Sequence, residues 1–302
     1  MRDITFEIRS HIARERIQVT SSTDIGFGLQ HVPEWSFTSA SSSKIRRSEG
    51  YAVSTFRSLA HAVAQLTVAN PRLYPLFRGQ AVDHRNKAEA STLYPTFFRA
   101  PLGRSRLTGI AISKRWRYLG AAVKQLKQHL DPMPWQVPLA QHREYWWALL
   151  QHYELAATPL LDATQSLRMA ATFALSDEHV WAKRPQGFVY VLGLPHAPAC
   201  LSPMVDEQMV LIRLQSICPP EALRPHFQEG YMIGRWPLSL RRLKGDNAAY
   251  RLVGKYRLDN TSGGFWDSGF EPIPRDAVYP PSDAFSSTVR EALANVVESR
   301  PA

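Results

Sequence analysis

Four short segments of the chain interrupt apolar runs with polar residues that could do chemistry. They are Leu76–Gln80, Gln151–Glu154, Leu160–Ser166 and Phe227–Ile233. In the first, Arg78 precedes Gly79, an arrangement that can direct a planar guanidinium at a phosphate or carboxylate while the backbone approaches closely. The alternative interpretation is an arginine that reaches solvent from the end of a strand.

The second segment could contact the ring of a ligand, and the third could bind an anion. His152 and Tyr153 could stack on a ligand ring or hydrogen-bond it; otherwise Tyr153 belongs to the core and His152 is its polar neighbour. Asp162, Thr164 and Ser166 gather where a loop enters a helix, and a helix N-terminus favours anions. The alternative is capping by Thr164 or Ser166, with Asp162 bracing the turn.

The fourth segment places Gln228 and Glu229 directly before Gly230 and an expected strand. A carboxylate there could bind a ribose hydroxyl and stabilise developing positive charge, or it is simply an exposed loop carboxylate. The common nucleotide, hydrolase and metalloprotease motifs are missing from the sequence. Its ten histidines show no ligand spacing backed by a carboxylate, so we expect no metal site.

Apolar periodicity and proline positions predict the elements that must hold these segments. Helices are expected over Phe56–Leu66, Ile112–Leu130, Gln141–Tyr153, Ser166–Leu175 with Ser166 as N-cap, from Pro219 onward, and over Phe285–Val297. Strands are expected over Ile4–Ile8, Leu73–Phe77 ending at a turn at Gly79, Gly187–Leu194, Gln208–Leu214, Gly230–Gly234 and Tyr250–Leu258. Helices come early and strands late, which predicts an α+β fold with a split sheet.

Composition describes a globular, basic protein of 302 residues with a formal net charge of +10. The basic clusters at Lys44–Arg47, Lys114–Arg117 and Arg241–Lys244 favour a solvated basic face over a dedicated DNA groove. We interpret the two cysteines as buried thiols in a reducing compartment. The sequence shows neither a secretory leader nor a bilayer-spanning run, so we expect a cytoplasmic protein that does not contact membranes.

Residues 1–50 differ from the rest in their serine-rich and basic stretches, and we expect them to form an N-terminal extension. The main domain is then expected over residues 51–302.

Taken in order, the segments resemble the FRG-domain family of bacteria. The resemblance rests on Phe77–Gln80, Leu93–Pro95 with Phe98–Arg99, Gln151–Tyr153, Leu160–Thr164, and Ala171–Ala174 with Phe173. The later run Ser216–Tyr231 looks like one branch of the family, so the resemblance covers roughly residues 52–298. The family often has glycine where this chain has Glu154, and a bulky residue where it has Ala163.

The order of these motifs is similar to that of ADP-ribosyltransferases of the arginine–serine–glutamate class. The resemblance implies an ADP-ribosyltransferase-like split β-sheet core with a helical N-terminal part. It also implies that Arg78, with Gly79 and Gln80, holds the phosphates of NAD, that Thr164 and Ser166 precede the helix, and that Glu229, or else Gln228, acts on the nicotinamide ribose.

The expected activity is ADP-ribosyl transfer or NAD cleavage by a toxin, effector or anti-phage defence component. NAD would be the substrate, with no metal, and the acceptor would be a protein or nucleic acid. Arg78, Thr164 or Ser166, and Glu229 are then expected to meet in one cleft. The alternatives are a non-catalytic module that binds a nucleotide or nucleic acid, and a structural or regulatory partner in a defence or toxin system.

Overall fold

The computed structural model describes residues 27–32, 36–100, 107–176, 183–197, 199–238, 248–266 and 269–294. The chain forms two units, each assembled from three separate segments. The first unit contains residues 1–92, 170–196 and 249–272, and the second contains residues 93–169, 197–248 and 273–302. The strand expected at Ile4–Ile8 and the basic cluster Arg241–Lys244 lie outside the described residues.

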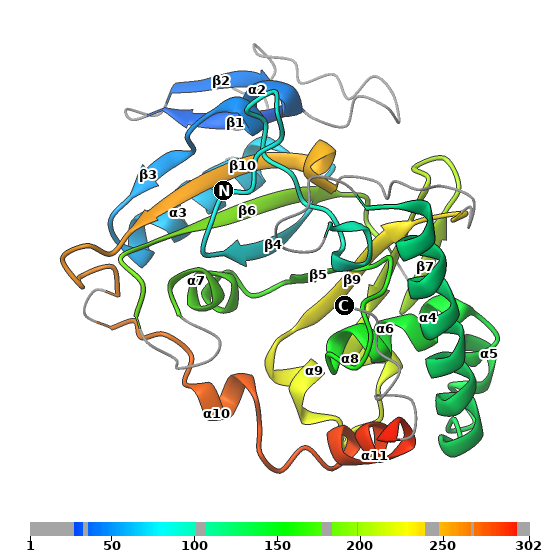
Figure 1. Cartoon of the computed structure of the whole chain (residues 1–302). Helices are drawn as coiled ribbons and strands as arrows, with labels where there is room; N and C mark the ends of the chain where they lie inside the picture. The colour runs from blue at the N-terminus through cyan, green and yellow to red at the C-terminus, as the bar shows by residue number, and fades with distance from the viewer. Residues whose placement is uncertain are drawn as a thin grey trace, which may run out of the picture. The chain divides into compact units, whose positions relative to one another are not determined.

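In the first unit, four strands lie side by side in the order β3-β10-β6-β4 (Figure 1). They are β3 (Tyr51–Val53), β10 (Leu252–Asp259), β6 (Gln186–Leu194) and β4 (Tyr74–Gln80). Strand β10 runs parallel to β3 and antiparallel to β6, which is in turn antiparallel to β4. The unit also holds the hairpin of β1 (Phe27–Val32) and β2 (Ser36–Ser41), followed by α2 (Ser42–Arg47).

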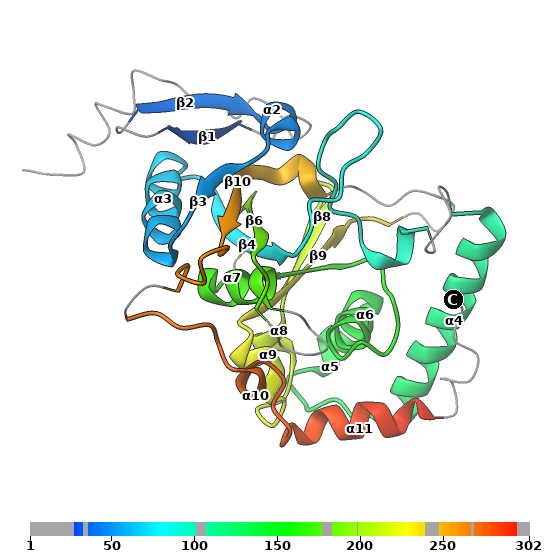
Figure 2. The same ribbon diagram turned by 60° about the vertical axis from the view of Figure 1, so that its left-hand side comes forward.

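Two helices, α3 (Phe56–Ala69) and α7 (Leu167–Leu175, of this unit from residue 170), cover one face of this sheet (Figure 2). Thr55 caps α3 by accepting a hydrogen bond from the Ser58 amide, and the apolar face of the helix is buried. Small strand residues let both helices approach closely: a Cβ at Gly254 would lie 2.7 Å from Leu66 Cδ2 on α3.

In the second unit, four strands follow the order β5-β9-β8-β7, and every neighbouring pair is antiparallel. They are β5 (Leu161–Thr164), β9 (Gly230–Arg235), β8 (Met209–Arg213) and β7 (Leu201–Met204). The helices of this unit are η1 (Thr96–Phe98), α4 (Gly109–His129), α5 (Val137–Ala140), α6 (Arg143–His152), α8 (Leu214–Ile217), α9 (Leu223–Phe227), α10 (Arg275–Val278) and α11 (Ala284–Ala292).

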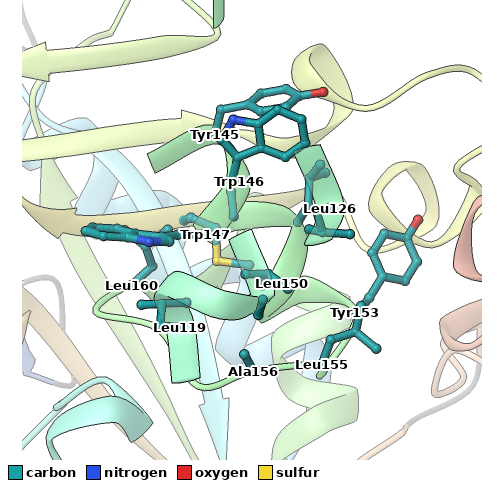
Figure 3. Packing of buried hydrophobic residues seen from close by; sticks show 14 of the residues in the cluster. Leu119, Leu126, Tyr145, Trp146, Trp147, Leu150, Tyr153, Leu155, Ala156 and Leu160 are labelled. Carbon is teal, nitrogen blue, oxygen red and sulfur yellow. The ribbon is translucent and has the colours of Figure 1, made fainter. Parts of the chain in front are cut away.

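The core of the second unit is built around α6, which is buried along most of its length. Tyr145, Trp146 and Trp147 of α6 pack with Leu119 and Leu126 of α4 (Figure 3). Helix α4 contacts both α6 and α11, so its apolar stripe is covered while its opposite face stays exposed.

Most expected helices and strands are confirmed, with boundaries that shift by a few residues. Two expectations are wrong. The helix expected from Pro219 begins at Leu223, after a turn. Strand β4 does not end before a turn at Gly79 but continues through it to Gln80.

The described residues form a mixed α and β fold, consistent with the expected α+β class. The N-terminal part expected to be helical also contains β1, β2 and β3, which the sequence did not predict because short strands give little periodic signal. The expected boundary between residues 50 and 51 stays a prediction. Among the described residues, no helix combines the length and apolar composition needed to cross a bilayer.

Candidate functional site

Three of the candidate residues, Arg78, Gly79 and Gln80, lie in strand β4 of the first unit. Arg78 pairs with Tyr190 of β6, and Gln80 pairs with Phe188. The guanidinium of Arg78 is close enough to Tyr190 to act on its pKa, which burial raises overall. Arg78 is therefore a partly buried side chain within β4, two residues before the strand ends at Gln80.

Gly79 is required by packing on the other face of β4. A Cβ at this position would stand 1.8 Å from the carbonyl oxygen of Ala170 and 2.9 Å from the amide nitrogen of Ala174. Gly187 of β6 meets the same helix, since its Cβ would lie 2.4 Å from the Ala174 oxygen. The glycine thus lets the backbone of α7 lie directly on the sheet.

The remaining candidates lie in the second unit, where hydrogen bonds link segments that are distant in sequence. Gln151 Nε2 donates to Asp162 Oδ2 at 2.9 Å, and Gln151 Oε1 accepts from the Thr158 amide at 3.0 Å. The side-chain amide of Gln151 therefore joins the end of α6 to strand β5. Asp162 accepts this hydrogen bond from within β5, and its expected role at the helix entry stays a prediction.

Thr164 and Ser166 hold the entry to α7, as capping predicts. Ser166 Oγ accepts from the Met169 amide at 3.3 Å, so Ser166 is the N-cap. Thr164 Oγ1 donates to the Gln228 carbonyl oxygen at 2.7 Å and accepts from the Ser166 amide at 2.9 Å. Its hydroxyl joins the β5–α7 connection to the segment before β9.

A second hydrogen bond completes this junction. The Gln165 amide donates to the carbonyl oxygen of Glu229 at 3.1 Å. Gln228 is buried, and its Nε2 donates to the Val278 carbonyl oxygen at 2.9 Å. Glu229 is partly exposed, and its carboxylate has no hydrogen-bond or ion-pair partner among the described residues. We call Thr164, Ser166, Gln228 and Glu229 the β5–β9 junction.

The backbone of Glu229 adopts φ +45°, in the left-handed region that non-glycine residues rarely occupy. Glu229 lies two residues after the end of α9. At this end the Gln228 amide donates a hydrogen bond to the Arg224 carbonyl oxygen at 3.0 Å. Such local strain persists only where the surrounding contacts hold it, and it concentrates at functional positions.

His152 ends α6 beside this junction. It is buried, and a Cβ at Gly230 would lie 3.6 Å from His152 Cε1. Burial, together with the positive charge of Arg224, holds the pKa of His152 well below its usual range, so the imidazole is neutral. Its Nε2 is buried without a hydrogen-bond partner among the described residues.

A buried polar cluster that sequence reasoning missed surrounds Arg224 on α9. Its side chain forms an ion pair with Glu154 and lies 4.7 Å from the centroid of the Tyr279 ring. Its backbone amide donates to Asp283 Oδ2 at 2.9 Å, and Tyr153 OH donates to the same oxygen at 3.2 Å. No local pattern could reveal these contacts, because they join residues more than 50 positions apart.

Tyr153 is fully buried, so the structural alternative describes its side chain. The expectation of two buried cysteines holds for Cys218 but not for Cys200, which is partly exposed. Burial raises the pKa of Cys218, which keeps its thiol protonated and a poor nucleophile. The described residues contain no group of three His, Cys, Asp or Glu side chains that could hold a metal ion.

The segments described above fall largely within one region of family similarity. Residues 75–182 match the family model of the FRG domain. The chain contains an FRG domain. No curated protein and no solved structure matches the chain.

The FRG match begins in β4 and includes α6, β5 and α7, so the β4 glycine and the helix it contacts lie within one family region. The segment Ser216–Tyr231, with Glu229, lies outside the match, which is shorter than the resemblance read from the sequence. The expected meeting of Arg78 with Thr164, Ser166 and Glu229 stays a prediction.

The departure at Glu154 also has a structural explanation. Glu154 adopts φ +57°, a conformation that glycine reaches without strain. The resemblance leads us to expect glycine there, whereas in this chain a glutamate accepts the strained backbone and pairs with Arg224.

Proposed function

We propose that this FRG-domain protein cleaves the nicotinamide–ribose bond of NAD, either hydrolysing it or transferring ADP-ribose to a protein or nucleic-acid acceptor, with Glu229 as the carboxylate at the ribose. The observation that carries the proposal is the β5–β9 junction. Two hydrogen bonds, of 2.7 Å and 3.1 Å, join the Thr164–Ser166 segment to Gln228 and Glu229.

The chemistry needs a negative charge beside a developing oxocarbenium ion, and it needs no metal. The Glu229 carboxylate suits this role because no described residue neutralises it and its backbone is held in a strained conformation. Gln228 suits it less, since its amide nitrogen already bonds Val278. The hydroxyls of Thr164 and Ser166 cap the entry to α7, and the Thr164 hydroxyl also bonds the backbone of Gln228, the residue before Glu229.

The test is an NAD-consumption assay on purified protein, with nicotinamide release followed by chromatography, alone and with bacterial extract as a source of acceptor. Glu229→Gln is nearly isosteric but uncharged. We expect it to lower turnover by about two to three orders of magnitude with an unchanged thermal melting curve. Glu221→Gln, an exposed glutamate before α9, is the matched control and should behave as wild type.

Wild-type turnover in Glu229→Gln would remove Glu229 from the mechanism. Absence of turnover by the wild type, with and without extract, would count against catalysis altogether. The role as a toxin, effector or defence component needs a separate test. Expression of the wild type should slow bacterial growth, and expression of Glu229→Gln should not.

A second candidate function, a nucleic-acid-binding module, is favoured by helix α4. This helix carries five lysines and arginines and no acidic residue. Lys114, Arg117 and Lys124 are exposed, and none of them has an ion-pair partner among the described residues. Gly120 and Ala121 lie on the same exposed side, where small side chains would let a phosphate backbone approach closely.

This candidate is tested by fluorescence anisotropy with labelled single-stranded RNA and duplex DNA over a range of salt concentrations. Replacing Lys114, Arg117 and Lys124 with glutamine should weaken binding and reduce the salt slope by about two for single strands. The matched control replaces three exposed cations of the first unit, Arg47, Arg72 and Lys87, and carries the same change in charge. Equal effects of the two triple variants would mean that only net charge matters.

A further inference from the structure

The face of the first unit's sheet opposite α3 and α7 carries charged and aromatic side chains. Cross-strand pairing aligns Gln80 with Phe188 and Phe188 with Arg257, while the next row aligns Arg78, Tyr190 and Lys255. Because side chains alternate along a strand, these six project to one face, and Gly79 and Gly187 project to the other. We call this the β6 face: Arg78, Gln80, Phe188, Tyr190, Lys255 and Arg257.

Two residues in one row of the β6 face, Tyr190 and Lys255, join a hydrogen-bonded network around Asp83. Lys255 Nζ donates to Asp83 Oδ2 at 2.7 Å and to the Ser48 carbonyl oxygen at 2.6 Å. Tyr190 OH donates to Asp83 Oδ1 at 2.8 Å, and Arg85 Nε donates to Asp83 Oδ2 at 2.7 Å. The Lys255 side chain is only 1% exposed, so Tyr190 and Lys255 form a rigid part of this row with satisfied hydrogen bonds.

The other row is open. Phe188 and Arg257 are partly exposed, and Arg257 donates no hydrogen bond to a described residue. The Phe188 ring is stacked with Tyr190, with centroids 6.4 Å apart and planes at 21°, and Lys255 Nζ lies 5.8 Å from its centre. A phenyl ring held in this way among cations has its orientation fixed before any ligand arrives.

Gln80 adds an unsatisfied acceptor beside this ring. Its Oε1 is buried, and no described residue donates a hydrogen bond to it. A buried acceptor without a partner is unfavourable, so an N–H donor from a ligand would be bound strongly there. The row thus offers one hydrogen-bond acceptor, one aromatic face and one guanidinium, on three strands that neighbour each other in the sheet.

We propose that the β6 face binds the ring of a nucleotide. The ring would stack on Phe188, an amino group on it would donate to Gln80 Oε1, and the phosphate would bind Arg257. The matching chemical class is a flat heteroaromatic ring that bears an NH₂ group and is linked through ribose to a phosphate. Both halves of NAD have this chemistry, so the inference rests on the proposed function for its choice of ligand.

The experiment is isothermal titration calorimetry on the full chain with adenosine monophosphate and with nicotinamide mononucleotide. Binding of the first identifies the adenine end of NAD as the occupant, and binding of the second identifies the nicotinamide end. Each is compared with an analogue that lacks the amino group, inosine monophosphate and nicotinic acid mononucleotide respectively. We expect the analogue to bind about tenfold more weakly or worse, because its oxygen faces the Gln80 acceptor.

Two variants test the residues. Phe188→Leu removes the ring and should weaken binding by about tenfold to a hundredfold. Gln80→Leu should bring the nucleotide and its analogue to equal affinity, a change in selectivity that a general loss of structure would not produce. Tyr250→Leu, which removes an exposed ring of the same unit, is the control and should bind as wild type. Thermal melting checks that each variant is folded.

Failure of this inference and failure of the proposed function give different results. Binding that depends on Phe188 in a protein that never consumes NAD supports the β6 face and counts against catalysis. Conversely, NAD turnover combined with wild-type affinity in Phe188→Leu overturns the β6 face and leaves the activity standing. If neither mononucleotide binds the wild type, the inference is wrong.

Discussion

Gly79 of β4 lies so close to α7 that a Cβ on it would stand 1.8 Å from the carbonyl oxygen of Ala170. The obstacle is backbone, which a side-chain rotation cannot relieve. We therefore expect Gly79→Ala to lower the free energy of unfolding by at least about 2 kcal/mol, because strand and helix must separate. Urea unfolding followed by circular dichroism measures the change.

Gly120→Ala is the matched control for this glycine substitution. Gly120 lies inside α4, and a Cβ there would meet nothing within 4 Å. Alanine is favoured over glycine in a helix interior by about 1 kcal/mol, so this variant should be slightly more stable than wild type. A Gly79→Ala variant as stable as Gly120→Ala would show that β4 and α7 can move apart at little cost in stability.

The contrast between the two glycines shows what the sequence could predict and what it could not. The helix around Gly120 follows from apolar spacing alone, and its boundaries were predicted to within a few residues. The role of Gly79 depends on Ala170 and Ala174, some 90 residues later, and local sequence suggested a turn. Periodicity reports which face of an element is buried, but not which backbone it meets.

Two substitutions of Glu154 separate the effect of its backbone strain on stability from the effect of its charge. Its backbone has φ +57°, and its carboxylate pairs with the buried Arg224 although its own side chain is 62% exposed. Glu154→Gln removes the charge and keeps the strain, whereas Glu154→Gly removes both. We expect the glycine variant to be the more stable of the two by about 1 kcal/mol, measured by urea unfolding. Equal stabilities would mean that the backbone is not strained.

The resemblance assigns the phosphates of NAD to Arg78, in addition to the Arg257 contact proposed for the β6 face, and this role can be tested by a conservative change. Arg78→Lys keeps the charge but loses the planar fork that binds a phosphate through two parallel hydrogen bonds. We expect both Arg78→Lys and Arg78→Ala to abolish NAD binding or toxicity, as measured by calorimetry and bacterial growth. A fully active lysine variant would show that only a positive charge is required.

Some features of the candidate site could likewise be predicted from the sequence, and others could not. The capping role of Ser166 and the position of Glu229 before a strand follow from local residue types, and both are confirmed. The cluster of Arg224, Glu154 and Asp283 has no such signal, since a buried charge is recognisable only from its partners. The burial of His152 was not predicted, since the alternative made it only a polar neighbour of a buried Tyr153.

That burial gives the stability of the protein a pH dependence. In the folded chain, burial and the charge of Arg224 depress the pKa of His152, whereas in the unfolded chain the imidazole has its ordinary pKa of about 6.5. A depressed pKa means that the unfolded state binds a proton which the folded state excludes. The stabilising contribution is therefore fully present above pH 6.5 and is lost as the pH falls below it.

The loss should amount to about 1.4 kcal/mol for each pH unit below 6.5, for as long as the folded imidazole stays neutral. The measurement is urea unfolding at several pH values between neutrality and mild acid, in wild type and in His152→Gln, whose amide does not titrate. Other histidines contribute equally to both proteins, so the difference between the two curves isolates His152. We expect the variant to be less stable than wild type at neutral pH and the gap to narrow as the pH falls. A gap that stays constant across the range would show that His152 accepts a proton as readily in the folded chain as in the unfolded one.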